Sequence, residues 1–309
     1  MTWLIGLLVA LPVAAFAALV LSGMHNLLLR QPRAKRRFPA WQDLGPTPLG
    51  EKRYTPQGMT FADGRIIFAN SWRNTRSRVY CYQPPKMEPL AEFDMPAEAV
   101  HTSGLAWDGE HLWAVDYISN CCYQIDLAES LRAREARVVG KFPTGLKGTS
   151  ACALLRYGGE EVLAISDFMR TRKTYLVRHR QAVANGTMAG AVVFAYTNEG
   201  FSQGLVWDGR HLYESENKRG VNVINQMDVD RLARTRCARA STVVQYDAPD
   251  RGVEDLAWDG QYMYTSDEVV FRFYRTAAEG LRTDAEARAA DWAVDRQTGA
   301  SSSRAEQGS

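Results

Sequence analysis

The segments TSGLAWDGEHLWAVDY, residues 102–117, and VEDLAWDGQYMYTSDE, residues 253–268, decide the fold of this 309-residue chain. Each contains two short, aromatic-rich apolar runs separated by Asp-Gly, which is the strongest short-range signal for a β-hairpin. Three further copies begin at Pro56, Ser150 and Ser202, so the pattern recurs five times at intervals of about 50 residues. The sequence is therefore built from repeats of one β-unit.

A third apolar run follows every hairpin, and a fourth run completes the first four copies. Four strands in each repeat of about 40 to 50 residues are typical of a β-propeller blade. We therefore predict an all-β fold, a five-bladed β-propeller. The fourth runs begin at Pro89, Ala136, Ala191 and Ser241.

The fifth repeat lacks a fourth run, because the chain after Arg275 reads as a helix or a tail. Residues 41–49, WQDLGPTPL, precede the first repeat where a fourth strand precedes every other repeat. We expect this N-terminal strand to pair with Val269–Arg275 and close the ring, since an open ring would expose two sheet edges. An open β-solenoid or sandwich and a sixth, degenerate blade are the alternatives.

Composition excludes several classes of protein. With 37 Lys and Arg against 35 Asp and Glu, the formal charge is only +2, which argues against a nucleic-acid partner. Five cysteines without a CxxC pair do not suggest a disulfide framework or a metal clip. The chain contains no Walker loop and no dinucleotide fingerprint, so we expect no cofactor and no metal.

Residues 3–22 contain no charged side chain, and a helix of this length matches the roughly 30 Å hydrocarbon core of a bilayer. We predict a single transmembrane helix that places the protein in the lipid bilayer. A cleavable signal peptide is the alternative, because residues 15–17 resemble a small-residue cleavage site. The expected divisions are an anchor at 1–29, a basic linker at 30–40, the propeller at 41–277 and a helical or disordered tail at 278–309.

Basic residues favour a cytoplasmic propeller, since Lys and Arg beside a span are retained on that side. The group runs from Arg30 to Arg37. Large domains can also translocate regardless of flanking charge, so an extracytoplasmic propeller stays open.

The repeats predict where polar side chains gather. In a propeller the first strand of each blade lines the central channel and the second returns antiparallel, so first-strand starts and second-strand ends share one face. The starting positions are Gln57, Ser103, Cys152, Gln203 and Glu254, and the ending positions are Ser71, Asp116, Ser166 or Asp167, Glu216 and Asp267. Such residues can bind a ligand, or they can cap backbone groups at strand ends.

We name Gln57, Trp72, His101, Ser103, Asp116, Gln203, Glu254 and Asp267 as candidate ligand-binding residues. Clustered carboxylates repel one another and lose hydration unless a cation, a donor or a proton compensates them, so one of them should have a raised pKa. Calcium held by Asp116, Glu254 and Asp267 is conceivable, although the chain has no EF-hand spacing.

The fourth repeat, GFSQGLVWDGRHLYESEN, carries Glu214 and Glu216, and Ala114 and Ala164 stand at the Glu214 position of two other repeats. It resembles the plant and bacterial type of glutaminyl-peptide cyclotransferase, a five-bladed propeller with an FTQGL strand followed by LYES. A second fragment around Ala69, Asn70 and Trp72 resembles that family's ANVW strand end. The order of the fragments and the continuation after Tyr-Glu-Ser differ from the family. The resemblance implies metal-free cyclisation of N-terminal Gln, with Glu214 or Glu216 as general acid and base and Trp72 packing the substrate.

Three functions remain open. The first is a membrane-anchored propeller that binds a small molecule or peptide at the channel mouth. The second is an enzyme of the cyclotransferase type, with Glu214 and Glu216 as catalytic residues. The third is a non-catalytic scaffold for protein interactions at the membrane.

Overall fold

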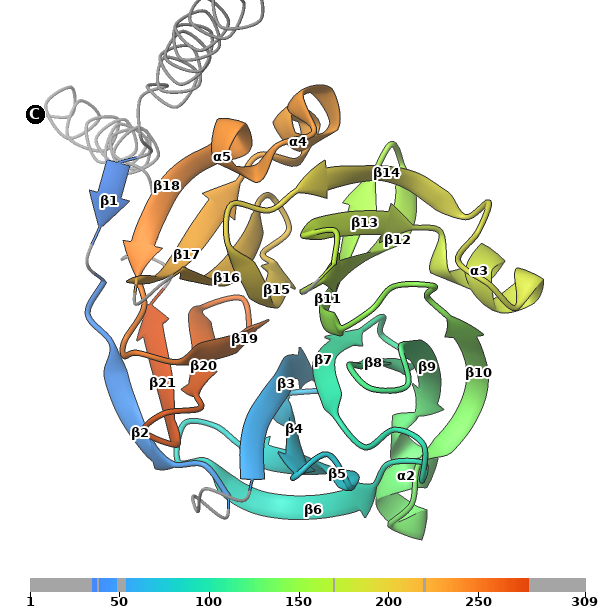
Figure 1. Cartoon of the computed structure of the whole chain (residues 1–309). Helices are drawn as coiled ribbons and strands as arrows, with labels where there is room; N and C mark the ends of the chain where they lie inside the picture. Colours follow the sequence, from blue (N-terminus) through green and yellow to red (C-terminus); the bar gives the residue numbers. More distant parts are fainter. Residues whose placement is uncertain (1–34, 38, 49–53, 169, 219–220, 278–309) are drawn as a thin grey trace, which may run out of the picture. The chain divides into compact units, whose positions relative to one another are not determined.

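The computed structural model describes residues 35–37, 39–48, 54–168, 170–218 and 221–277. Five antiparallel sheets surround a central axis (Figure 1), so the predicted five-bladed propeller is confirmed. The predicted spanning segment at 3–22 and the tail at 278–309 lie outside the described residues. None of the helices in the described part combines the length and apolar character needed to cross a bilayer.

Each of the first four blades contains four successive strands from the channel outward, as the repeats predict. The first blade contains β3 (Tyr54–Ala62), β4 (Arg65–Trp72), β5 (Arg76–Gln83) and β6 (Glu88–Asp94), and the second contains β7 (Thr102–Trp107), β8 (Leu112–Asp116), β9 (Cys121–Asp126) and β10 (Arg137–Pro143). The third contains β11 (Thr149–Tyr157), β12 (Glu160–Asp167), β13 (Lys173–Val177) and β14 (Val192–Thr197), and the fourth contains β15 (Phe201–Trp207), β16 (Leu212–Lys218), β17 (Val221–Met227) and β18 (Thr242–Asp247). A short strand, β1 (Lys35–Arg37), extends the fourth sheet beyond β18.

The fifth blade confirms the predicted closure of the ring. It contains β19 (Val253–Trp258), β20 (Tyr262–Asp267) and β21 (Arg272–Ala277), and its outer strand is the N-terminal β2 (Gln42–Pro46). Strand β2 pairs antiparallel with β21, with Gln42 opposite Arg275. The two ends of the propeller are thus hydrogen-bonded to each other, which leaves no gap between the first and last repeats.

Short helices separate the third and fourth strands of the second, third and fourth blades, and the sequence pattern did not reveal them. Each of the three longer helices has seven residues, and two begin at an aspartate that caps the first turn: Asp126 accepts the Glu129 N–H, and Asp228 accepts the Arg231 N–H. The helices are α2 (Leu127–Ala133), α3 (His179–Asn185), α4 (Val229–Thr235) and α5 (Ala238–Ser241).

The hairpin turns divide into two kinds. In the first and third blades two residues with positive φ connect the strands, Asp63-Gly64 and Gly158-Gly159, as expected of a tight hairpin. In the other three blades the turn is longer and the Asp carboxylate accepts backbone N–H groups. Asp108, for example, accepts those of Glu110 and His111 at 2.8 and 2.5 Å. The same Asp-Gly pair therefore serves two turn geometries.

One aspartate fills the axis of the ring. Asp255 is fully buried and stands where the first and fourth inner strands carry Gly58 and Gly204. A Cβ at Gly204 would lie 2.3 Å from the Asp255 Cα, so the inner strands approach too closely for a side chain there. The Asp255 carboxylate accepts backbone N–H groups from four blades, those of Met59, Leu105, Leu205 and Leu256, at 2.8 to 3.3 Å.

Candidate functional site

Two glutamates lie side by side on β16 of the fourth blade. Glu214 and Glu216 are two residues apart on a strand, so they point to the same side, and both are fully buried. The N–H of Gly200 donates to Glu216 Oε1 at 2.8 Å. Within the part of the chain that the structure describes, three of the four carboxylate oxygens have no hydrogen-bond partner. They are both oxygens of Glu214 and Oε2 of Glu216. The pair is therefore buried with most of its acceptors unused.

Further polar groups without partners surround this pair. Tyr196 Oη on β14, and the side-chain amide nitrogens of Asn198 and Asn225, also have no hydrogen-bond partner among the described residues. Asn225 on β17 is the register partner of Glu214, and Ser202 on β15 is that of Glu216. We call these six residues the Glu214 cluster: Tyr196, Asn198, Ser202, Glu214, Glu216 and Asn225.

One side of the Glu214 cluster is anchored to the third blade. Ser202 Oγ lies 2.9 Å from Ser166 Oγ, which lies 2.7 Å from Thr174 Oγ1. The Thr174 hydroxyl in turn donates to Asn198 Oδ1 at 2.9 Å. This hydroxyl chain links the third and fourth blades and includes neither carboxyl group.

The environment keeps protons on the two glutamates. Burial raises the pKa of Glu216 to about 7, with the Gly200 N–H acting in the opposite direction. Burial, and then the neighbouring charge of Glu216, raises the pKa of Glu214 well above its ordinary value. Near pH 7 Glu216 thus gains and loses a proton readily, and Glu214 beside it holds a proton more tightly than an exposed glutamate does. A carboxyl group with a pKa near the working pH is suited to proton transfer.

A second group of carboxyl side chains lies where the fourth and fifth blades meet. Gln203 Nε2 on β15 donates to Glu254 Oε1 on β19 at 3.2 Å. Burial, and then the charge of Glu268, raises the pKa of Glu254 well above its ordinary value. Gln203 and Glu254 thus lie together, as the starting positions of adjacent inner strands should.

Asp116 and Asp267 bind backbone at the ends of the second strands. Asp116 accepts the N–H groups of His101, Ile118 and Ser119 at 2.6 to 3.0 Å. Asp267 accepts those of Gly252, Val269 and Val270 at 2.7 to 2.8 Å. The hydroxyl of Ser103 donates to the Thr149 carbonyl at 2.6 Å. These contacts match the strand-end capping role that the sequence left open.

The remaining candidates lie in the first blade and its junction with the second. Gln57 is buried on β3, and the guanidinium carbon of Arg76 lies 4.3 Å from the centre of the Trp72 ring. His101 Nδ1 hydrogen-bonds the Asn74 side chain. Burial lowers the pKa of His101 to about 4, so its ring is neutral at pH 7. In the described part, the carboxylates of Asp116, Glu254 and Asp267 do not gather within ligand distance of one another, as calcium would need.

The structure adds residues that the sequence reasoning missed. Asp255 is not among the predicted site residues, although it stands at a position that is glycine in three repeats. Tyr196 lies on β14 of the third blade, so only the packing of one blade on the next brings it to Glu214. Asn225 lies opposite Glu214 on the adjacent strand of the same blade. The predicted starting position Cys152 is displaced by one residue. Ala153 pairs with Ala164 as Leu105 pairs with Ala114, so Cys152 corresponds to Gly104 and not to Ser103.

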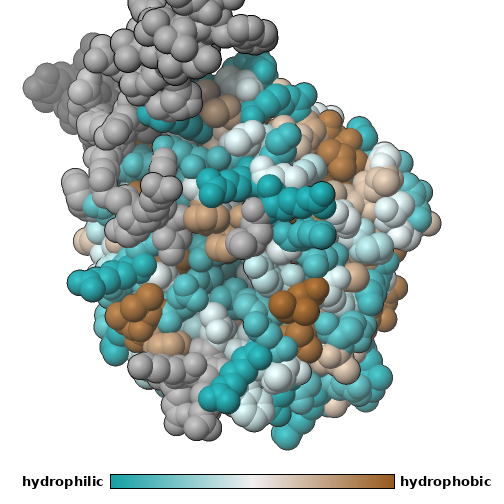
Figure 2. Space-filling model, viewed as in Figure 1, coloured by the Kyte–Doolittle hydropathy of each residue, from teal (hydrophilic) through white to brown (hydrophobic). Residues whose placement is uncertain are grey.

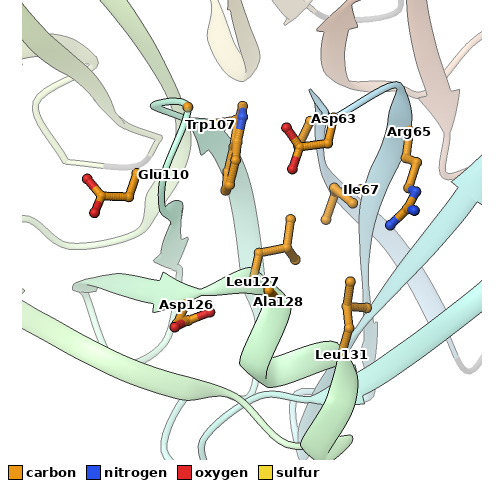
Figure 3. A pocket seen from close by; sticks show the side chains of 11 residues that line it. Asp63, Arg65, Ile67, Trp107, Glu110, Asp126, Leu127, Ala128 and Leu131 are labelled. Carbon is orange, nitrogen blue, oxygen red and sulfur yellow. The ribbon is translucent and has the colours of Figure 1, made fainter.

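A separate pocket of about 240 Å³ lies where the first and second blades meet. Figure 3 shows the Trp107 indole between the acidic side chains of Asp63 and Glu110, with Leu127 of α2 closing one side. Figure 2 shows the face seen in Figure 1 as mainly hydrophilic, with isolated hydrophobic spots. That view favours a polar ligand over an extended apolar partner on this face.

Comparison with known proteins supports the fold. No protein-family model matches the chain, and no curated protein matches it. The crystal structure of glutaminyl cyclase from Myxococcus xanthus superimposes with a TM-score of 0.55 at 13% sequence identity, covering 79% of this chain and 99% of that one. A mitotic checkpoint complex structure aligns with a TM-score of 0.43 at 11% identity, over 73% of this chain and 76% of that one. The chain is thus similar in fold to a propeller glutaminyl cyclase.

Proposed function

We propose that the protein binds a small polar ligand or a peptide terminus at the channel mouth beside the Glu214 cluster. The supporting observation is the number of fully buried polar atoms there without a partner, which includes three of the four carboxylate oxygens. Buried polar groups are normally hydrogen-bonded, and each unpaired one costs about 1–3 kcal/mol. A ligand that offers amine or amide N–H groups would supply the missing donors. It would approach past Gly200, which already contacts Glu216.

The reaction that this site supports best is cyclisation of an N-terminal glutamine. Within the fourth repeat, the FSQGL and LYES runs that resemble the cyclotransferase family lie on the paired strands β15 and β16, with Leu205 opposite Glu214. In the proposed reaction a carboxylate accepts a proton from the α-amino nitrogen, which attacks the γ-carboxamide carbon. The protonated partner carboxyl gives its proton to the departing ammonia, and pyroglutamate forms. The fold likeness to the Myxococcus xanthus enzyme agrees with this proposal.

The test measures ammonia release and pyroglutamate formation from a Gln-initiated peptide. We expect turnover by the unmodified protein and at least a hundredfold loss in Glu214→Gln and Glu216→Gln, in line with the usual contribution of general acid–base catalysis of about 10² to 10⁴. Glu88→Gln is the control, since that side chain is largely exposed on β6 and belongs to the first blade.

The outcomes separate the proposals. A well-folded protein without turnover removes the cyclotransferase function. If the same Gln-initiated peptide then raises the melting temperature of the unmodified protein, but not of Glu214→Gln, the binding function stands alone. If the peptide shifts neither protein, binding of this ligand class at Glu214 is wrong, and the scaffold function takes its place.

We further propose that residues 3–22 anchor the protein in a membrane, with the propeller on the cytoplasmic side. The support is the uncharged span and the basic residues from Arg30 to Arg37. In cell fractionation the full chain should remain with membranes after alkaline carbonate washing, and a chain starting at residue 39 should not. Recovery of the full chain in the soluble fraction contradicts the anchor. Reaction of an added cysteine at residue 186 with an impermeant reagent in intact cells would contradict the cytoplasmic side.

A further inference from the structure

A buried histidine without a partner lies at the junction of the second and third blades. His179 is 1% exposed, and neither ring nitrogen has a hydrogen-bond partner among the described residues. It is the first residue of α3, and the first residues of α2 and α4 are the apolar Leu127 and Val229, which are also buried. An apolar side chain therefore fills this place in the neighbouring blades. A histidine at this position leaves two buried ring nitrogens unpaired, which costs free energy. An apolar side chain would fill the space without that cost.

Two carboxylates face this histidine. Glu161 on β12 places Oε1 3.6 Å from His179 Nε2, and that oxygen is buried without a hydrogen-bond partner within the described ranges. Asp108, in the hairpin turn of the second blade, completes a group whose three ligand atoms all lie within 4.8 Å of one another. These separations approach the roughly 3.4 Å between ligands of a tetrahedral zinc ion, whose bonds are about 2.0–2.2 Å.

Further contacts hold two of these side chains in place. Trp113 donates its indole N–H to Asp108 Oδ2 at 2.8 Å and also packs edge-on against the His179 ring, with centres 4.7 Å apart. Such outer contacts orient metal ligands. Arg180, a largely exposed side chain, forms an ion pair with Glu161 Oε1 at 3.6 Å, which is beyond hydrogen-bond distance.

We propose that His179, Glu161 and Asp108 bind a zinc ion that links the second and third blades, with water at the fourth position. One imidazole and two carboxylates suit zinc, and three protein ligands leave one coordination position open. The site is separate from the Glu214 cluster, which lies between the third and fourth blades, and it does not depend on the function proposed there.

The fourth blade supplies a matched control. Its hairpin turn has the same Asp-Gly-Arg/Glu-His arrangement, with Asp208 accepting the His211 N–H at 2.6 Å as Asp108 accepts that of His111. There, however, His211 Nδ1 lies 2.9 Å from Gln226 Nε2, which gives that imidazole a partner. His211→Gln thus changes a buried histidine in an equivalent blade without touching the proposed ligands.

The experiment titrates the metal-stripped, full-length protein with zinc in competition with a chromophoric chelator. We expect one zinc per chain, a rise in melting temperature on binding, and a cobalt derivative with the intense visible absorption of four-coordinate cobalt. His179→Gln and Glu161→Gln should each weaken zinc binding at least a hundredfold, since even the outer contacts of a metal site contribute 10- to 100-fold. His211→Gln should leave the zinc affinity within about threefold.

Several results would overturn the zinc site. They are less than one zinc per chain at micromolar metal, equal affinity in Glu161→Gln and the unmodified protein, or the same loss in His211→Gln. A pale, six-coordinate cobalt spectrum would also contradict it. Glu161 is at the surface end of its strand, so Glu161→Gln should fold even if His179→Gln does not, and the test stays decisive.

Discussion

Asp255→Asn should reduce the free energy of unfolding by about 3 kcal/mol or more, a large part of the stability of a typical domain. Each carboxylate oxygen of Asp255 accepts two backbone N–H groups. Oδ1 accepts those of Leu205 and Leu256, and Oδ2 accepts those of Met59 and Leu105. In asparagine one oxygen becomes an NH₂ group, which would face two N–H donors in a fully buried place. Urea unfolding, followed by tryptophan fluorescence, measures the loss.

Asp259→Asn is the matched control for this prediction. Asp259 also accepts two backbone N–H groups on one oxygen, those of Gln261 and Tyr262, but in a partly exposed turn of a single blade. Asparagine keeps that oxygen, so we expect a loss of no more than about 1 kcal/mol. If the two variants lost equal stability, Asp255 would not be the link between blades that its position indicates.

Glu216→Gln should stabilise the protein at pH 8 while it abolishes function. In the unfolded chain the carboxyl ionises near 4.5, but burial raises the pKa of Glu216 in the folded protein to about 7. The folded state therefore binds more protons between these values, and stability falls as pH rises through them. At pH 8 the cost of ionising Glu216 is about 3 kcal/mol, which a neutral glutamine avoids. Glutamine also keeps a carbonyl oxygen for the Gly200 N–H.

The measurement compares urea unfolding of the variant and the unmodified protein at pH 4.5 and pH 8. We expect a small difference at pH 4.5 that grows in favour of Glu216→Gln at pH 8. Glu88→Gln, an exposed position, should show no such growth. A difference that is equal at both pH values would mean that Glu216 ionises in the folded protein as it does in an unfolded chain. A gain in stability together with lost function is the signature of a site and not of a structural residue.

Much of the architecture could be predicted because it rests on local patterns. Aromatic-rich runs around Asp-Gly fix hairpins, and their recurrence fixes the number of blades. The offset of residues 41–49 from the first repeat is enough to predict the closing strand, which pairs with β21. The helices before the fourth strands escaped prediction because each has only seven residues or fewer, too short for a clear periodic signal.

The candidate site could be predicted only in part. Glu214 and Glu216 stand out in the sequence because smaller residues occupy the Glu214 position in two other repeats. Their high proton affinity depends on burial and, for Glu214, on the neighbouring charge of Glu216, and no spacing in the sequence reveals that burial. The ring positions Asp116 and Asp267 look alike in the sequence, and only their contacts show that both hold backbone N–H groups.

The sequence by itself determined the repeat, the number of blades and the closure, because hairpins and strand order depend on short-range alternation and turn chemistry. Tertiary structure alone decided which polar side chains lie together. Glu161 and His179 come from one blade and Asp108 from another, and the N–H donors around Asp255 come from four blades. Burial and charge proximity set proton affinity, and both arise only when one sheet packs against the next.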